Sequence, residues 1–299
     1  MYTLSKPLSL LIVLFVYIAA FFAGLLVFNV LPDWGFLSYL IADAAATVVV
    51  WAFGIVFKNA SLYDPYWSVA PIVLFICFIM QAGSADILDI LYIAVFSIWG
   101  IRLTANWIIG WRGMAHQDWR YTMLKQKNPK IWFLTNFFGI NMMPTLFVFV
   151  NMLSAYLCAF STGDQLSIIS VAGVLVCLAA VILQIVSDSQ MMMFRKDARN
   201  SGLSIQSGLW RYSRHPNYLG EVSFWWGAWL MQMGALGTLW WTVTAPVLMT
   251  MLFVLISIPM MENRLTGTKK DYDAYQKRTS MLLIWPPRPA AAEDMNESI

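Results

Sequence analysis

Eight long apolar segments divide this 299-residue sequence, and they constrain its fold more than any other feature. Each is close to the roughly 20 residues that a helix needs to cross the hydrocarbon core of a bilayer. Lipid offers no partners to backbone polar groups, which favours helices over irregular structure. The sequence therefore predicts an all-α, polytopic membrane bundle with about eight transmembrane spans. The segments cover residues 8–31, 37–57, 66–81, 87–110, 132–160, 166–194, 216–233 and 239–261.

The distribution of charge predicts the orientation of these segments. Only 12% of the residues are charged and 60% are hydrophobic, whereas soluble domains carry about 25% charged residues. If the N-terminus is cytoplasmic, eight crossings place every Lys and Arg of the loops on one side, and Arg102 in the nearest half of its span. This positive-inside pattern predicts that both termini are cytoplasmic. The net charge of +3 is explained by this topology, so no nucleic-acid partner is expected.

Nothing in the sequence separates a soluble domain, so residues 1–299 are predicted to form a single integral membrane domain. Within it we distinguish two N-terminal spans (1–57), a core that carries the candidate site (58–262) and a cytoplasmic tail (263–299). The two histidines are far apart in the sequence, and the three cysteines are scattered through apolar runs. No metal site is therefore expected.

The most informative polar feature is the stretch Gly208–Glu221, which reads Gly-Leu-Trp-Arg-Tyr-Ser-Arg-His-Pro-Asn-Tyr-Leu-Gly-Glu. Arg211, Arg214 and His215 fall within five positions, and Pro216 suits the first turn of a helix. Cations beside a helix N-terminus form a site for an anion such as phosphate. The alternative is a set of interfacial basic residues that flank a membrane span.

Ionisable residues inside spans are costly and usually face a bundle interior or a cavity. Gln184 and Asp188 share one helical face, and Arg195 follows on the same side. This arrangement allows either an ion pair that joins two helices or a grip on the hydroxyl and phosphate groups of a ligand. Asn217 and Glu221 are also one turn apart, so they can bind a carboxamide or a ribose hydroxyl, or Glu221 can pair with a nearby arginine.

Two further aspartates lie in or beside the early spans. Asp64 is followed by a proline, which is typical of a helix N-cap. It also lies between Tyr63 and Tyr66, and a carboxylic acid beside phenols can polarise a carbonyl in an apolar pocket. Asp43 lies among alanines without an evident partner, so the sequence supports neither a cavity-facing nor a helix-joining role for it.

In combination, these motifs resemble the steroid 5-alpha-reductase superfamily, including its uncharacterised bacterial branch and, more distantly, the sterol C14 and C7 reductases. The stretch from Gly208 to Glu221 is similar to the signature of that superfamily. The resemblance covers most of the chain from about residue 60 onward. Its other parts are Asp64-Pro65-Tyr66-Trp67, Trp99-Gly100-Ile101-Arg102, Asp118-Trp119-Arg120-Tyr121, Ser187-Asp188 with Arg195, Met261-Glu262-Asn263-Arg264, Tyr272-Asp273-Ala274-Tyr275, Arg278 and Trp285-Pro286.

This resemblance implies a reductase of the bacterial inner membrane that binds NADPH from the cytoplasm and a lipophilic substrate from the bilayer. The reaction would deliver a hydride to the β-carbon of an enone, and a proton to its α-carbon. Asp64 would polarise the carbonyl. The animal enzymes carry a tyrosine on the following span, where this chain has Trp99, and Tyr63 or Tyr66 is a candidate to replace it. The residues implied in cofactor binding are Asp188, Arg195, Arg211, Tyr212, Arg214, His215, Asn217, Tyr218 and Glu221.

Membrane methyltransferases that modify isoprenylcysteine or phospholipid headgroups share the Arg-His-Pro-x-Tyr-x-Gly turn, and they use S-adenosylmethionine. Three features favour the reductase: the number of spans, the Ser187-Asp188 pair with Arg195, and Asp64-Pro65. A third reading is a lipid or sterol binder that keeps the scaffold without the chemistry. The choice between NADPH and NADH, the substrate and the oligomeric state stay open.

Overall fold

The computed structural model describes residues 4–83, 85–161, 166–237 and 240–289, and these residues form helices and connecting loops without a strand. The prediction of an all-α fold is confirmed. The chain divides into two compact units, residues 1–164 and 165–299, and each is described here by itself. The last ten residues of the predicted cytoplasmic tail lie outside the described residues. This division does not test the prediction that the chain forms a single integral membrane domain.

Seven helical stretches of the described residues are long and apolar enough to cross a membrane, which is consistent with a polytopic bundle. The helix at the seventh predicted segment, α10 (Pro216–Leu236), has 21 residues and is also long enough. It is less apolar because Asn217, Glu221 and Gln232 lie along it. The seven stretches are Lys6–Val30, Phe36–Val56, Ala60–Ala82, Ile87–Gly110, Pro129–Asn151, Ile168–Lys196 and Trp240–Thr266.

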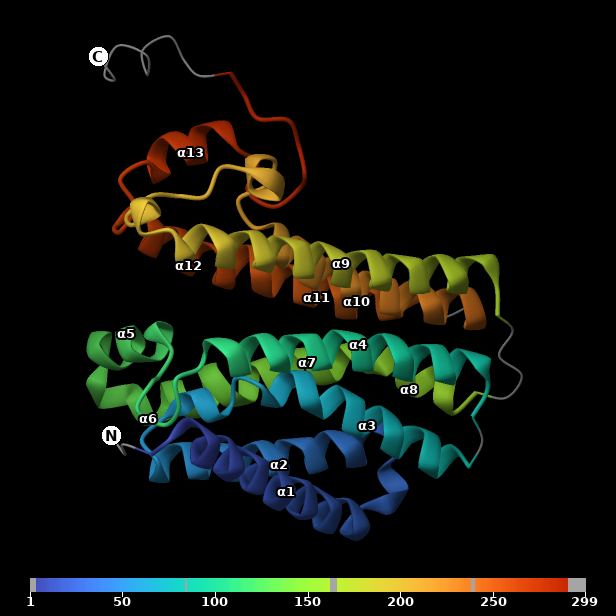
Figure 1. Cartoon of the computed structure of the whole chain (residues 1–299). Coiled ribbons are helices and arrows are strands. Elements are labelled where there is room, and N and C mark those ends of the chain that lie inside the picture. Colours follow the sequence, from blue (N-terminus) through green and yellow to red (C-terminus); the bar gives the residue numbers. More distant parts are fainter. Residues whose placement is uncertain (1–3, 84, 162–165, 238–239, 290–299) are drawn as a thin grey trace, which may run out of the picture. The chain divides into compact units, whose positions relative to one another are not determined.

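The first unit begins with α1 (Lys6–Val30), α2 (Phe36–Val56), α3 (Tyr66–Ala82) and α4 (Ile87–Gly110). Helix α1 packs on α2, and α3 packs on α4 (Figure 1). Asp86 caps α4, because its carboxylate accepts hydrogen bonds from the backbone nitrogens of Leu88 (2.8 Å) and Asp89 (3.0 Å). These ends agree with the predicted segments to within a few residues, since hydropathy and caps are local signals.

The predicted span 132–160 is not one regular helix. It consists of α6 (Trp132–Leu134), a π-helical stretch (Thr135–Met142), α7 (Met143–Asn151) and α8 (Leu153–Ala159). Pro144 lies in the first turn of α7, where its missing N–H and its ring are incompatible with the hydrogen bond of a continuing α-helix. The wider π-helical turn before it accommodates this break. The short helix α5 (Trp119–Lys127) precedes this region.

The second unit is built on the long helix α9 (Ile168–Lys196), which packs along α10. Gly220, Gly227 and Gly234 recur every seven residues on α10 and let the two backbones approach closely. A Cβ atom on Gly227 would lie 2.7 Å from the Cys177 sulfur and 2.9 Å from the backbone oxygen of Gly173. Small residues at such a spacing are typical of tight helix pairs in membranes.

Three shorter helices complete the second unit. They are α11 (Thr244–Leu252), α12 (Ile258–Thr266) and α13 (Tyr272–Arg278), with a π-helical stretch (Phe253–Ser257) between α11 and α12. Residues 279–289 then continue without helix. This unit contains all nine residues that the resemblance implies in cofactor binding, whereas Asp64 and Tyr66 belong to the first unit.

Candidate functional site

A cavity of about 370 Å³ lies between α1, α2 and α3 of the first unit. Most of its wall consists of aliphatic, aromatic and small apolar side chains from these three helices. Its volume and its few polar groups are typical of a site for a small lipophilic ligand. The oxygen-bearing side chains on the wall are those of Tyr17, Tyr39, Asp43, Tyr66 and Gln81.

Asp43 of α2 and Tyr66 of α3 form a buried pair on the wall of this cavity. The Tyr66 hydroxyl donates a hydrogen bond to the Asp43 carboxylate at 2.7 Å. The two residues are only 6% and 7% exposed, so the pair is shielded from water. Tyr66 is a residue that the sequence predicts to act on a substrate carbonyl. The structure adds Asp43 as its partner, on the neighbouring helix.

Asp64, the other residue predicted to polarise a carbonyl, contacts side chains of α4 and α5. Its carboxylate accepts hydrogen bonds from the hydroxyl of Tyr121 and from the indole nitrogen of Trp107, at 3.3 Å for Trp107. Burial, and then the neighbouring Asp64 charge, raise the pKa of Tyr121 well above its ordinary value. The phenol therefore stays protonated and donates to Asp64. Asp64 joins the segment before α3 to α4 and α5, and its action on a substrate remains a prediction.

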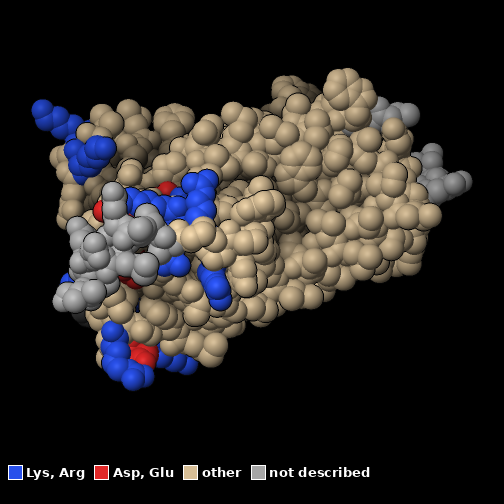
Figure 2. All heavy atoms as spheres, turned by 90° about the horizontal axis from the view of Figure 1, so that it is seen from above, with Lys and Arg blue, Asp and Glu red and all other residues tan. Residues whose placement is uncertain are grey.

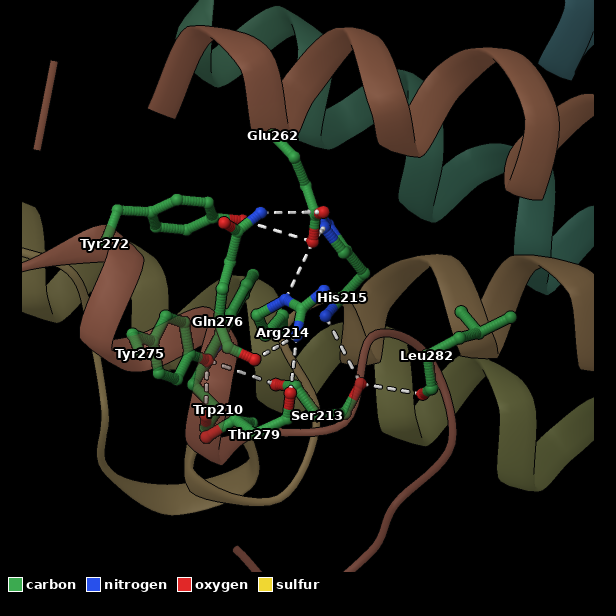
Figure 3. Close-up of polar contacts among 10 residues, drawn as sticks. All are labelled: Trp210, Ser213, Arg214, His215, Glu262, Tyr272, Tyr275, Gln276, Thr279 and Leu282. Carbon is green, nitrogen blue, oxygen red and sulfur yellow. Dashed lines mark hydrogen bonds and ion pairs between the residues drawn. The ribbon is translucent and has the colours of Figure 1, made fainter. Parts of the chain in front are cut away.

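Residues 211–215, which precede α10 and are called here the basic turn, hold one of their cations in a buried ion pair. Arg214 Nε donates to Glu262 Oε1 at 2.7 Å, and Arg214 Nη1 donates to the backbone oxygen of Gln276 at 2.9 Å (Figure 3). The side chains of Arg214 and Glu262 are 10% and 14% exposed. The positive charge of Arg214 is therefore largely balanced within the protein, which lowers the charge that the turn offers to an anion.

Glu262, in the middle of α12, accepts several further hydrogen bonds (Figure 3). The Tyr272 hydroxyl donates to Oε1 at 3.3 Å, the Gln276 amide nitrogen donates to Oε2 at 3.0 Å, and His215 Nε2 lies 3.2 Å from Oε1. Burial, and next the Glu262 charge, raise the pKa of Tyr272, so its phenol remains a donor. This one carboxylate thus links the turn before α10 with α12 and α13.

The segment after α13, residues 279–288, folds back along the basic turn and is called here the C-terminal strap. Ser213 Oγ donates to the backbone oxygen of Leu282 at 2.7 Å, and the backbone nitrogen of Trp285 donates to Tyr212 O at 3.1 Å. The Arg214 backbone nitrogen donates to Ser280 O at 2.8 Å. The strap therefore holds the backbone of the basic turn in place, a function that the sequence alone does not indicate.

Glu221 lies in a second polar cluster of the second unit, between α9 and α10. It is 4% exposed, and its carboxylate accepts hydrogen bonds from Gln184 Nε2 at 2.7 Å and from Trp225 Nε1 at 3.1 Å. Two buried acceptors nearby on these helices, Gln184 Oε1 and Asn217 Oδ1, have no hydrogen-bond partner among the described residues. Buried polar atoms without partners are uncommon and indicate a place for a ligand or water.

The remaining predicted cofactor residues differ in exposure. Arg195 and Arg211 are exposed, and the Arg211 guanidinium lies 5.9 Å from the centre of the Tyr212 ring. Asp188 is partly exposed on α9, and the Tyr218 ring stacks on His215 at 5.3 Å. Figure 2 shows Lys and Arg gathered at one end of the face in view. Within the second unit these residues fall in the segments 195–214 and 264–288.

The residues that the sequence left without a role are recognised through contacts between distant segments. Asp43 lies 23 residues before Tyr66, and Glu262 lies 48 residues after Arg214. An ionisable residue within an apolar span is a candidate functional residue by default. The position of Asp43 inside such a span was the one feature of the sequence that indicated a role for it. Gln184 carried a weaker signal, since it lies one turn before Asp188.

Residues 50–279 match a family model whose description is "Protein of unknown function (DUF1295)". The chain belongs to this family. One similar protein is an uncharacterized protein of Schizosaccharomyces pombe. It is 25% identical to this chain over 242 residues, and the alignment covers 70% of this chain and 67% of the relative. No solved structure matches the chain. The DUF1295 match includes Tyr66, the basic turn and Glu262, whereas Asp43 and residues 280–288 of the C-terminal strap lie outside it.

Proposed function

We propose that this protein is a membrane-embedded reductase that uses NADPH to reduce a carbon–carbon double bond conjugated to a carbonyl in a lipid. The observation that carries the proposal is the Asp43–Tyr66 pair on the wall of an apolar cavity. A carboxyl group and a phenol on successive helices match what the resemblance to the steroid 5-alpha-reductase superfamily implies for carbonyl recognition. The proposal transfers this role from Asp64 to Asp43.

The proposed reaction requires the protein to stabilise negative charge on the carbonyl oxygen of the substrate. As a hydride reaches the β-carbon, the electrons of the double bond move toward that oxygen. A donor fixed in a dry cavity stabilises this charge more than water does. Tyr66 has a single hydroxyl hydrogen and would donate it to the substrate oxygen. Asp43, as a neutral carboxylic acid, would then donate to the Tyr66 oxygen and hold the phenol in place. A proton then reaches the α-carbon, which restores the carbonyl and completes the addition of two hydrogens.

The second unit offers residues that fit a nicotinamide dinucleotide. When bound, this cofactor supplies the hydride. Gln184 Oε1 and Asn217 Oδ1 are buried acceptors without a partner among the described residues, as the amide hydrogens of a carboxamide or the hydroxyls of a ribose require. Arg195 and Arg211 are exposed cations that can bind phosphate. Asp188, Tyr212, His215, Tyr218 and Glu221 complete the proposed cofactor-binding set, and Arg214 supports it through Glu262.

The proposed location is the bacterial inner membrane, with the cofactor site facing the cytoplasm. Support comes from the Lys and Arg residues, which the positive-inside rule assigns to the cytoplasmic side. Soluble nucleotides are available on that side. The lipophilic substrate would enter from the bilayer, since several residues of α1 near the cavity, such as Phe21 and Leu25, are exposed apolar side chains.

The test uses purified full-length protein in lipid nanodiscs with NADPH deuterated at C4 and a panel of steroidal and linear enones. Mass spectrometry should find deuterium at the β-carbon of a saturated product. If S-adenosylmethionine is bound in place of NADPH and a methyl group is transferred to a lipid, the reductase is rejected in favour of the methyltransferase. Protein that binds lipids but neither cofactor would be a lipid binder without this chemistry.

A further inference from the structure

The cavity of the first unit carries a second polar pair besides Asp43 and Tyr66. Tyr39 of α2 lies on its wall and donates a hydrogen bond to Gln81 Oε1 of α3, and it also lies 3.4 Å from the backbone oxygen of Cys77. We call Asp43–Tyr66 the inner pair and Tyr39–Gln81 the outer pair. Tyr39 is buried, whereas Gln81 is exposed near the end of α3. The outer pair therefore lies where the cavity approaches the surface of the unit.

The two pairs are anchored at opposite ends of α3. Lining residues recur every three or four positions on this helix from Tyr66 to Gln81, so one face of α3 borders the cavity along nearly its whole length. Fifteen residues of α-helix correspond to about 22 Å along the axis. The cavity is thus elongated beside α3, with a polar group near each end and an apolar wall between them.

Polar groups in an apolar cavity determine how a ligand is oriented. A buried hydroxyl that loses its hydrogen-bond partner is costly. An apolar ligand end that disturbs the hydrogen bond between Tyr39 and Gln81 offers no new partner in return. A ligand oxygen at that end can accept from Tyr39 or from the Gln81 amide group, and a hydroxyl can also donate to Gln81. A carbonyl at the other end suits the Tyr66 donor.

We propose that the cavity binds an elongated lipid with two oxygen groups, a ketone at the inner pair and a hydroxyl or second carbonyl at the outer pair. The inference rests on the proposed function only for assigning the ketone to the inner pair. It names the class of substrate: a lipid that is polar at both ends, as opposed to a hydrocarbon chain with a single headgroup. The outer pair then selects substrates by their far end.

The experiment measures binding in the absence of NADPH, with saturated ketones that cannot be reduced at a conjugated double bond. Two matched probe pairs are used: a fused-ring ketone with and without a hydroxyl at its far end, and a linear methyl ketone with and without a terminal hydroxyl. Dissociation constants are measured by equilibrium dialysis against protein in nanodiscs. In at least one pair the hydroxylated member should bind about tenfold more tightly, as one good hydrogen bond provides.

The variants Tyr39→Phe and Gln81→Leu should each abolish this preference. Tyr66→Phe should weaken both members of a pair by the same factor. Tyr156→Phe is the matched control, because its ring lies 6.2 Å from that of Tyr39 but its side chain does not line the cavity. This control should keep the preference and also report any loss caused by disturbing the aromatic cluster.

Equal binding of both members in each pair, no saturable binding of any probe, or a preference that survives Tyr39→Phe would overturn the inference. These outcomes are independent of the reductase test. Discrimination between the probes without any enone reduction would reject the reductase and leave the two-ended ligand in place. Enone reduction without discrimination would reject the two-ended ligand alone.

Discussion

The Tyr66 hydroxyl and the Asp43 carboxylate are joined by a 2.7 Å hydrogen bond between two neighbouring helices, on the wall of an apolar cavity. Neither group is part of a helix cap, and both are shielded from water. Charged or acidic groups inside a membrane protein are costly unless they are paired or functional. This pair is therefore the strongest candidate for the group that recognises the polar end of a lipid.

Replacing Tyr66 by Phe should lower the turnover of an enone by about a hundredfold, because one donor to a developing oxyanion is lost. Substrate affinity should change much less, since the donor acts most strongly as charge develops. The measurement is kcat and KM with protein in nanodiscs. Tyr63→Phe is the control: its ring lies 5.6 Å from that of Tyr66, but its hydroxyl contacts Thr145. Equal turnover in both variants would remove Tyr66 from the mechanism.

The Arg214–Glu262 ion pair should determine how firmly the C-terminal strap is held. Glu262→Gln leaves Arg214 in a nearly buried position without its counter-charge, which costs on the order of 3 kcal/mol. The strap should open more often, and trypsin should cut after Lys277 and Arg278 at a rate at least tenfold higher. Cleavage is followed by mass spectrometry of the intact protein.

The control for this prediction is the ion pair between Arg199 and Asp197, at 2.6 Å, in which the arginine side chain is 89% exposed. Exposed pairs contribute little to stability, so Arg199→Ala should leave the cleavage rate after Lys277 unchanged. If Glu262→Gln is cleaved no faster than this control, the pair does not hold the strap.

The membrane-spanning helices could be predicted because their signals are local. Hydropathy placed α9 and α10 to within a few residues, and Pro216 correctly marked the start of α10. The π-helical stretch before Pro144 was missed, since apolar composition does not report helix geometry. The count of spans depends on α10, whose polar residues lower its hydropathy.

The sequence could predict which site residues share one face of a helix, but not which residues they contact. Gln184 and Asp188, or Asn217 and Glu221, are one helical turn apart, which periodicity reveals. The pairing of Asp64 with Tyr121 spans 57 residues, and such contacts depend on how helices and loops pack. The sequence therefore indicated Asp64 as an important carboxylate but could not say which group it contacts.

The close approach of α9 and α10 predicts that Gly227 tolerates no side chain. A methyl group there would meet the backbone oxygen of Gly173 and the backbone nitrogen of Cys177, both at 2.9 Å. Gly227→Ala should therefore destabilise the protein by about 1–3 kcal/mol, as overpacking does. Gly110→Ala is the control, because nothing lies within 4 Å of an added Cβ atom. Thermal unfolding in nanodiscs measures both, and equal melting temperatures would contradict the tight packing.

The polar cluster around Glu221 predicts where the nucleotide binds. Asn217→Ala removes an acceptor that has no partner among the described residues, so it should weaken NADPH binding without destabilising the fold. Loss of one hydrogen bond to a buried ligand corresponds to roughly a tenfold increase in Kd. Glu221→Gln should have a larger effect, because the charge that orients Gln184 and Trp225 is lost.

Gln232→Met provides the matched control for these two variants. Gln232 is a buried amide on the same helix, about three turns beyond Glu221, and its side-chain oxygen accepts from Thr242 at 2.7 Å. The substitution should lower the melting temperature and leave the Kd for NADPH unchanged. Calorimetric titration measures the Kd for all three. If Gln232→Met raises the Kd for NADPH as much as Asn217→Ala does, Asn217 acts only through the stability of α10. The nucleotide would then bind elsewhere.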